Sequence, residues 1–337
     1  MNAPHRFSTL SWLIRDTFRQ SLASGVFWLV LGISLLCILL CASMSVSGDI
    51  SLRPSADENP DFLPRFDPDA GNAHKLKQSG VVVVRGELSL AWGAMRVPLA
   101  RDARGAVRFV QLVLAGGVAG TLGLLLALVW TAGFMPGFLD GRNVSVLLAK
   151  PAARWQLLMG KYAGVLCFVF CHAALFVGGT WLMIGLRTGI WETGYLWAAP
   201  LLVLNFAIFF GCSLLLAVCT RSTVMSVFGS ILFWMLCWGM NFGRHALAMA
   251  DSVAPQSPHS KPLLWMSDLG YWLLPKPADL GMLLYDSLGA SDHFGRMFDP
   301  AALAAHGFSM TFSVLSSLLF AVYLFCAASQ QFTKTDY

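Results

Sequence analysis

The sequence predicts an all-α polytopic membrane protein with six transmembrane helices, an N-terminal interfacial helix and a small β-rich extracytoplasmic insertion. Its composition supports this fold class, because 56% of the residues are hydrophobic and only 12% are charged, whereas soluble domains carry about 25% charged residues. Apolar runs long enough to cross a bilayer as helices also recur along the chain. The net charge of +5 is small, and there is no lysine-rich tail or basic stripe interleaved with aromatics, so we expect no nucleic-acid partner.

The first 25 residues place bulky apolar side chains at helical spacing. Phe7, Ile14 and Phe18 fall on one face, with charged residues opposite. This pattern is typical of an amphipathic helix (1–25) lying in the membrane interface, although an ordinary juxtamembrane anchor fits the spacing nearly as well. The apolar run at 26–46 is too long for a cleaved signal and lacks a clear cleavage site, so we predict a retained first span.

A polar segment, 47–108, follows the first span. It begins with several prolines and acidic residues, and then alternates over 87–92 as a half-buried strand does, with Gly86 and Gly93 as turns. A segment of this length can cross the membrane largely regardless of its basic residues. We therefore predict a β-rich extracytoplasmic insertion, which could also bind an extracytoplasmic partner.

Five further apolar runs complete the predicted bundle. Gly116 and Gly120 form a small-xxx-small pair that permits close helix contact, either within the chain or in a dimer seam. Before the last run lies an acidic segment, 249–300, whose aromatic part is bent by Pro275 and Pro277; it lies on the outer interface or re-enters the bilayer. The five predicted spans are 109–133, 162–186, 196–218, 224–247 and 303–327.

The segment 134–161, between the second and third spans, is short and basic. Its apolar middle, Val144–Leu148, can form a short helix, which Pro151 interrupts because proline lacks the N–H that a helix needs. Short basic loops stay on the cytoplasmic side, so six spans place both termini there as well. This elbow suits docking of a soluble partner; a topology anchor that touches only lipid headgroups is the alternative, and charge and spacing do not separate the two.

The chain carries no phosphate-binding G-x-x-x-x-G-K-[ST], no H-E-x-x-H and no G-x-S-x-G motif, so we expect neither ATP binding by that route nor catalysis. Charged groups at membrane depth, which mark ion pumps and proton-coupled carriers, are nearly absent, which favours an apolar or amphipathic cargo or none that fully crosses. Arg244 and His245, near the outer end of a span, are expected to snorkel to water. The polar residues of the spans are Gln111, His172, Asn205, Asn241, Arg244 and His245.

All eight cysteines fall within or beside apolar runs, so we expect no disulfide framework. Two Cys-x-x-x-Cys pairs, Cys37/Cys41 and Cys167/Cys171, each lie on one helix face, and His172 follows the second pair. Such a pair could hold a soft metal such as Cu(I), but no acid or methionine cluster completes a site. The favoured interpretation is that these cysteines pack as small apolar residues and that His172 hydrogen-bonds another helix.

Along the elbow the following residues occur in order: Asp140-Gly141, Leu147-Leu148-Ala149-Lys150-Pro151, Arg154 and Gly160-Lys161-Tyr162. This pattern resembles the first cytoplasmic loop of ABC-2 type permeases, the membrane subunits of certain ATP-driven transporters. The N-terminal helix, the six spans and the segment Leu274–Pro277 also match, and permeases of copper-enzyme maturation are the most similar subgroup. Phe138–Asn143 lacks the family's common Glu-rich and Gly-Thr pattern, and the insertion is longer than in the simplest members, which would suit a different ATPase or substrate.

The resemblance implies a mechanical role with no cofactor in this chain. In this family two permease copies form a homodimer in the bacterial inner membrane. Each elbow binds in a groove on a cytoplasmic ABC ATPase subunit, and that subunit binds ATP and magnesium. The implied coupling residues are Asp140, Gly141, Arg142, Leu147, Leu148, Lys150, Pro151, Arg154 and Lys161, of which Arg142, Lys150 and Arg154 are the expected contacts and Pro151 sets the bend. Two other functions stay open: an ATP-independent scaffold or assembly factor that uses the insertion, and an intramembrane copper-handling protein that uses the cysteine pairs.

Overall fold

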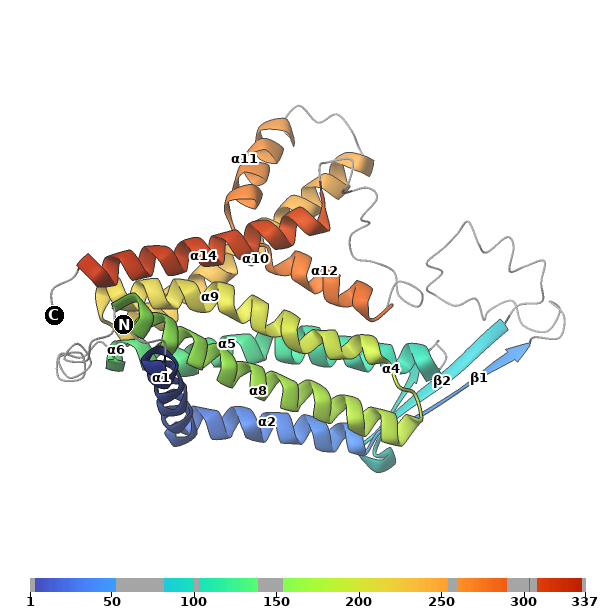
Figure 1. Cartoon of the computed structure of the whole chain (residues 1–337). Helices are drawn as coiled ribbons and strands as arrows, with labels where there is room; N and C mark the ends of the chain where they lie inside the picture. Colours follow the sequence, from blue (N-terminus) through green and yellow to red (C-terminus); the bar gives the residue numbers. More distant parts are fainter. Residues whose placement is uncertain are drawn as a thin grey trace.

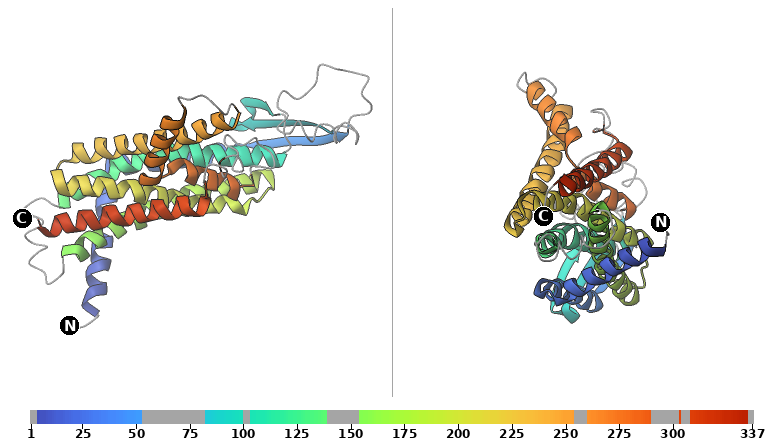
Figure 2. Two further views of the ribbon diagram at one scale, coloured as in Figure 1. Left: turned by 90° about the horizontal axis from the view of Figure 1, so that it is seen from above. Right: turned by 60° about the vertical axis from the view of Figure 1, so that its left-hand side comes forward.

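The computed structural model describes residues 4–52, 82–99, 103–138, 154–253, 260–289, 303 and 308–334. Long helices run side by side, with both termini at one end of the bundle and a β-sheet at the other (Figure 1). We call these the terminus end and the sheet end; Figure 2 shows the same elongated shape from two further sides. The helices are α1 (Pro4–Ala23), α2 (Gly25–Ala42), α4 (Ala103–Leu112), α5 (Leu124–Ala132), α6 (Phe134–Phe138), α8 (Arg154–Thr188), α9 (Ala198–Thr220), α10 (Thr223–Val253), α11 (Ser260–Leu273), α12 (Pro277–Ser287) and α14 (Met310–Lys334).

Six helical stretches in the described part of the chain are long and apolar enough to cross a membrane. They are Gly25–Ala42, Ala103–Phe138, Arg154–Thr188, Thr193–Thr220, Thr223–Met249 and Met310–Lys334. Each overlaps one predicted span, but the bounds differ at several ends. The first helix ends at Ala42 rather than 46, the third begins at Arg154 rather than 162, and the last begins at Met310 rather than 303.

Helix α1 lies across the bundle at the terminus end, and the chain turns sharply into α2 (Figure 1). It contacts α8 closely because Gly164 has no side chain: a Cβ there would lie 2.8 Å from Thr17 Oγ1. Beside this contact the rings of Phe18 and Phe168 meet edge to face, with centroids 4.9 Å apart. Apolar packing therefore fixes α1 against α8, and not only against whatever surrounds the bundle.

The sheet is antiparallel with strand order β1 (Ser45–Leu52), β2 (Val82–Leu90) and β3 (Met95–Leu99), so the predicted β-rich character is present in the described strands. Its base is joined to the helices, because the Ala91 N–H donates to Ser43 Oγ at 2.9 Å. Leu88 is buried there in one apolar cluster with Met44 and Val107. The tight turn between β2 and β3 leaves the Trp92 side chain 72% exposed.

Between α4 and α5 the chain forms a π-helix, η2 (Val113–Gly123). The wider turn is visible at Thr121, whose hydroxyl donates to the carbonyl of Gly116 at 3.3 Å, five residues earlier. Of the predicted small-xxx-small pair, Gly120 lies against α9, where an added Cβ would be 3.7 Å from Leu202 Cδ2. An added Cβ at Gly116 would meet open space within 4 Å, so this glycine borders a hollow and not a described helix. Such π segments are rare and often lie at functional positions.

Two apolar clusters form the core. The larger surrounds buried aromatic side chains in the middle of the bundle, among them Trp130, Phe168 and Phe206. The smaller lies toward the sheet end and includes Phe176 and Tyr195. These clusters hold α2, α5, α8 and α9 together, and buried side chains of α1, α10, α12 and α14 pack into the larger of them.

Candidate functional site

The predicted coupling elbow lies mostly outside the described residues. What the structure describes is the frame on either side of it: α6 ends at Phe138, and α8 begins at Arg154. Both ends of the elbow are therefore helical and lie at the terminus end of the bundle (Figure 1). The predicted coupling residues that fall outside the described ranges are Asp140, Gly141, Arg142, Leu147, Leu148, Lys150 and Pro151.

Lys161, two turns into α8, is fully buried. Its Nζ donates to Gln20 Oε1 at 2.5 Å and lies 3.4 Å from Asp16 Oδ2, both on α1. The same ammonium lies 6.0 Å from the ring centroid of Phe134 and 5.9 Å from that of Phe138, both on α6. This position explains why α8 begins before the predicted span. The helical turn that carries Lys161 packs against α1 and α6, so its charge lies among protein partners. Lys161 thus joins the two ends of the elbow to α1.

Arg154 lies at the first position of α8 and is half-buried. Its Nη1 donates to the backbone carbonyl of Thr333 at 3.2 Å, at the end of α14. A guanidinium at a helix C-terminus is favourable, because the last carbonyls of a helix carry partial negative charge. The exit of the elbow is therefore attached both to α1, through Lys161, and to α14, through Arg154.

A second polar site lies where α11 and α12 form a bent hairpin against α10, α9 and α14. Its turn, Leu274–Lys276, is held by side chains of two other helices. The backbone N–H groups of Ala278 and Asp279 donate to Asn241 Oδ1 at 2.8 and 3.2 Å, and that of Lys276 donates to Ser317 Oγ at 3.1 Å. The first N–H groups of a helix lack partners within it, so Asn241 caps α12 from α10.

The carboxylate of Asp279 is the centre of this hairpin cluster and is fully buried. His245 Nε2 lies 2.6 Å from its Oδ1 and Asn241 Nδ2 donates to the same oxygen at 3.0 Å, while the Tyr271 hydroxyl donates to Oδ2 at 2.7 Å. The Ser313 hydroxyl also donates to Oδ2. Donors thus come from α10, α11 and α14, so the carboxylate joins three helices to α12. A buried charge is tolerated only with partners of this kind.

The structure corrects the prediction that Arg244 and His245 snorkel to water. Both side chains are buried, at 1% and 0% exposed. Arg244 Nε donates to Asp268 Oδ1 at 2.9 Å, and its guanidinium lies 4.3 Å from the ring centroid of Tyr271. The reason is that α11 and α12 fold back onto α10 and cover this face with acidic and aromatic partners.

Lys276, at the turn of the hairpin, is also buried, at 1% exposed. Its Nζ donates to Ser316 Oγ at 2.7 Å and to the Leu274 carbonyl at 3.3 Å, and it lies 4.7 Å from the ring centroid of Tyr271. Sequence reasoning did not assign Lys276 or Asp279 to a buried cluster, because both belong to a polar segment. The available signal was proline at the first position of a helix followed by an acid in its first turn.

Asp279, Lys276 and Tyr271 lie outside the six candidate spans, and their surroundings shift their pKa values. Burial raises the pKa of Asp279, but the hydrogen bond and charge of His245 and the hydrogen bonds from Ser313 and Tyr271 lower it by more, so it lies below its ordinary value. Burial lowers the pKa of Lys276 to about 8, against attraction from Asp279. Burial and the charge of Asp279 raise the pKa of Tyr271, which keeps its hydroxyl a neutral donor. At neutral pH the carboxylate is therefore the acceptor of the cluster.

The cysteine pairs that were considered for a soft metal are placed differently in the two cases. Cys41 is buried in the apolar core, whereas Cys167 and Cys171 are on the surface. His172 Nε2 lies 3.1 Å from Ser34 Oγ, so it bridges α8 to α2. Among the residues that the structure describes, no three His, Cys, Asp or Glu side chains gather as a metal site would require.

The sequence from residue 11 to residue 337 matches the family model described as ABC-2 family transporter protein. The chain belongs to the ABC-2 transporter family. A comparison with curated proteins gives no match. The matched range includes the elbow, the hairpin cluster and all six candidate spans, so both sites lie within the region that the ABC-2 family shares.

Membership of the ABC-2 family makes this chain a multi-pass membrane protein of a transporter family whose members are generally non-catalytic. It agrees with the resemblance carried by the elbow residues. The match is to the family as a whole, so the copper-enzyme maturation subgroup stays a prediction. The predicted insertion, residues 47–108, also lies within the range that the family model matches.

Proposed function

We propose that this chain is the membrane-spanning permease subunit of an ABC-2 type transporter and that a separate cytoplasmic ATPase subunit drives it. The observation that carries the proposal is the family match over residues 11–337. The contacts of Lys161 support it, because they give the elbow a route for transmitting force to the rest of the chain. ATP and magnesium bind to the partner and not to this chain.

The proposed mechanism begins at the elbow, which binds to the ATPase. When the ATPase closes on ATP, it displaces the elbow. Displacement of the start of α8 carries Lys161, and through Asp16 and Gln20 it carries α1. The hydrogen bond from Arg154 to the Thr333 carbonyl passes the same displacement to α14. Work of this kind requires that the ATPase contact two conformations of the permease differently. Arg142, Lys150 and Arg154 are the proposed contacts, and Pro151 sets the bend.

The proposed orientation places the terminus end in the cytoplasm and the sheet end outside the bacterial inner membrane. The short basic elbow supports this orientation, because basic residues accumulate in short cytoplasmic segments. Two copies pair as a homodimer, each with one ATPase subunit beneath it. Large apolar side chains exposed on α2, α10 and α14 face lipid or the second copy, among them Trp28, Leu232 and Leu319.

Co-purification tests the proposal. The tagged wild-type chain, extracted in mild detergent from cells that express its neighbouring genes, should retain a soluble subunit that a photoreactive ATP analogue labels. Arg154→Glu should release that subunit, because the variant reverses a charge beside the elbow. Arg187→Glu is the matched control: Arg187 is an exposed arginine in the last turn of the same helix, at the sheet end. Equal recovery in both variants would contradict docking at the elbow.

Two outcomes would favour the alternative functions. If no nucleotide-binding subunit is ever recovered, and a partner instead depends on residues 47–108, the chain acts as an ATP-independent scaffold. If the purified chain carries copper that Cys167→Ser with Cys171→Ser removes, it acts on metal. The absence of a third ligand near either cysteine pair among the described residues favours the permease over the metal-handling function.

A further inference from the structure

We propose that a cavity between η2, α9, α10 and α12 binds an uncharged, largely apolar molecule that carries a single hydrogen-bonding group such as a hydroxyl. As a binding site the cavity stands independently; as the cargo site of the permease it rests on the proposed function. The cavity measures about 580 Å³. This volume lies within the range of about 300–1,000 Å³ that small-molecule sites occupy.

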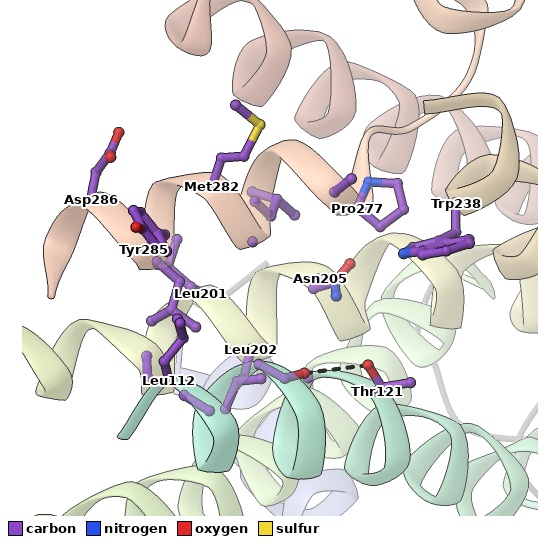
Figure 3. Close-up of a pocket in the computed structure, with 18 of the residues that line it drawn as sticks. Leu112, Thr121, Leu201, Leu202, Asn205, Trp238, Pro277, Met282, Tyr285 and Asp286 are labelled. Carbon is purple, nitrogen blue, oxygen red and sulfur yellow. Dashed lines mark hydrogen bonds between the residues drawn. The ribbon is translucent and has the colours of Figure 1, made fainter. Parts of the chain in front are cut away.

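The walls of the cavity come from four elements that are distant in sequence (Figure 3). Leu201 and Tyr285 line it at one side and Trp238 at the other, with Asn205 between them (Figure 3). The cavity is open at the surface rather than sealed, and Trp238, one of its lining residues on α10, is 45% exposed. An opening along the side of a candidate span admits molecules that are dissolved in lipid.

Polar groups in the cavity are few, and they match one small polar function. Asn205 Oδ1 is buried and has no hydrogen-bond partner among the described residues. A buried acceptor without a donor is costly. Rotation of the Asn205 amide toward the cavity that it lines would let a ligand hydroxyl donate to this oxygen and recover that free energy. The Thr121 hydroxyl already donates to Gly116, which leaves its oxygen able to accept.

Charge in the lining argues against an ionic ligand. Among the described residues that line the cavity, Asp286 is the one with a charged side chain. This side chain is exposed and points away from the other lining residues (Figure 3). The neighbouring Asp279 and Lys276 do not line the cavity, since their side chains are committed to the hairpin cluster. An ion would therefore enter an apolar space without a counter-charge, which is strongly unfavourable.

Helix α12 contributes both to the cavity and to the hairpin cluster. Leu280 and Leu284 contribute to the cavity wall, whereas Asp279 on the same helix joins α10, α11 and α14. A ligand that enters the cavity thus touches the element whose other face carries the buried carboxylate. Occupancy of the cavity should for this reason stabilise the hairpin against unfolding.

Two glycines in the walls allow the cavity to be filled without disturbing the backbone. An added Cβ at Gly116 of η2 or Gly281 of α12 meets no atom within 4 Å. Gly116→Leu and Gly281→Leu should each place a side chain in the cavity from an opposite wall. Gly117→Leu is the matched control, because Gly117 is the next residue of the same π-helix, has the same open surroundings and does not line the cavity.

The test uses the purified full chain in lipid vesicles and a hexadecanol probe with a diazirine in its alkyl chain. Irradiation followed by peptide mapping should label α12 and the first half of α9, and unmodified hexadecanol should suppress the label. Labelling there should fall by about tenfold in Gly116→Leu and in Gly281→Leu, a loss of about 1.4 kcal/mol, and stay unchanged in Gly117→Leu. Asn205→Leu should reduce labelling by the alcohol about fivefold, as expected for one lost hydrogen bond, and leave labelling by the matching hexadecane probe unchanged.

Label spread over the lipid-facing helices and insensitive to Gly116→Leu and Gly281→Leu would overturn the proposal. Equal labelling by the alcohol and hydrocarbon probes would overturn the role of Asn205. Because no ATPase is present in this experiment, a positive result stands even if Arg154→Glu has no effect on co-purification. Conversely, a negative result leaves docking of the ATPase at the elbow untouched.

Discussion

The two polar sites bury charge in different ways. At the terminus end, the ammonium of Lys161 is fully buried, but its partner Asp16 is 34% exposed and both of its polar partners come from α1. In the hairpin cluster, Asp279 and His245 are both fully buried, and the carboxylate accepts from α10, α11 and α14. The first arrangement is a joint that connects α8 to α1 and α6, and solvent reaches its carboxylate. The second ties four helices together through groups that are shielded from solvent. The comparison predicts that the terminus end is the part that moves and that the hairpin is the part that stays fixed.

The largest effect is expected at Asp279. Asp279→Ala leaves His245, Asn241 and Tyr271 buried without their acceptor, so we expect a loss of about 3–5 kcal/mol in the free energy of unfolding. Asp286→Ala, an exposed acid on the same helix, should change stability by less than about 0.5 kcal/mol. Denaturant titration in detergent measures both. Similar losses for the two variants would show that the hairpin is not fixed by this carboxylate.

A smaller and asymmetric effect is expected at the terminus end. Asp16→Ala leaves the buried ammonium of Lys161 with Gln20 as its described acceptor, so we expect a loss of about 2–3 kcal/mol. Lys161→Met removes the buried charge itself and leaves Asp16 partly hydrated, so its loss should be smaller. The same titration, completed with the double variant, gives the coupling energy. If Lys161→Met proved the more damaging change, the joint would not depend on burial of this charge.

Contact between α1 and α8 can be weakened without changing charge. Gly164→Ala places a Cβ 2.8 Å from Thr17 Oγ1 and should cost about 1–2 kcal/mol, because the two helices must separate. Gly178→Ala, on the same helix, meets no atom within 4 Å and should be neutral or slightly stabilising, by up to about 1 kcal/mol. Thermal unfolding of the two variants compares them. Equal midpoints would remove close packing of α1 as part of the joint.

A further effect in the hairpin is a pH dependence. Lys276 has a pKa of about 8 in the folded chain and 10.5 as its ordinary value, so between these pH values the unfolded chain binds more protons. Stability should therefore rise from pH 8 to pH 10.5 and fall as the pH is lowered through this window. The rise should be larger in the wild type than in Lys276→Met, measured as the difference in thermal midpoint, which cancels the titration of Tyr271. Identical profiles would mean that Lys276 is not held in a shielded position.

Much of the fold follows from local sequence properties. The six apolar runs predicted the six long helices, because length and hydropathy alone define a candidate span. The alternation around Leu88 predicted a strand, and Leu88 is indeed buried in the sheet base. The bounds were less accurate where polar residues lie inside a helix, as Lys161 does in α8, because its partners come from another element.

The polar clusters could not be predicted in the same way. Arg244 and His245 were expected at a water boundary, because they lie near the outer end of a predicted span. Their actual partners, Asp268 and Asp279, come from a hairpin whose fold depends on contacts between distant residues. The cavity is likewise formed by four elements, and the sequence marked only Asn205 and the glycines of one wall. The elbow, in contrast, was assigned from its residue pattern, and its coupling role stays a prediction.

Site-specific photo-crosslinking tests the central claim most directly. A benzoylphenylalanine placed at Leu147, inside the elbow, should crosslink to a subunit that also binds a photoreactive ATP analogue. The same group at Trp92, which is 72% exposed at the sheet end, should give no such product. A crosslink to the nucleotide-binding subunit from position 92, or from neither position in cells that contain that subunit, would contradict the account.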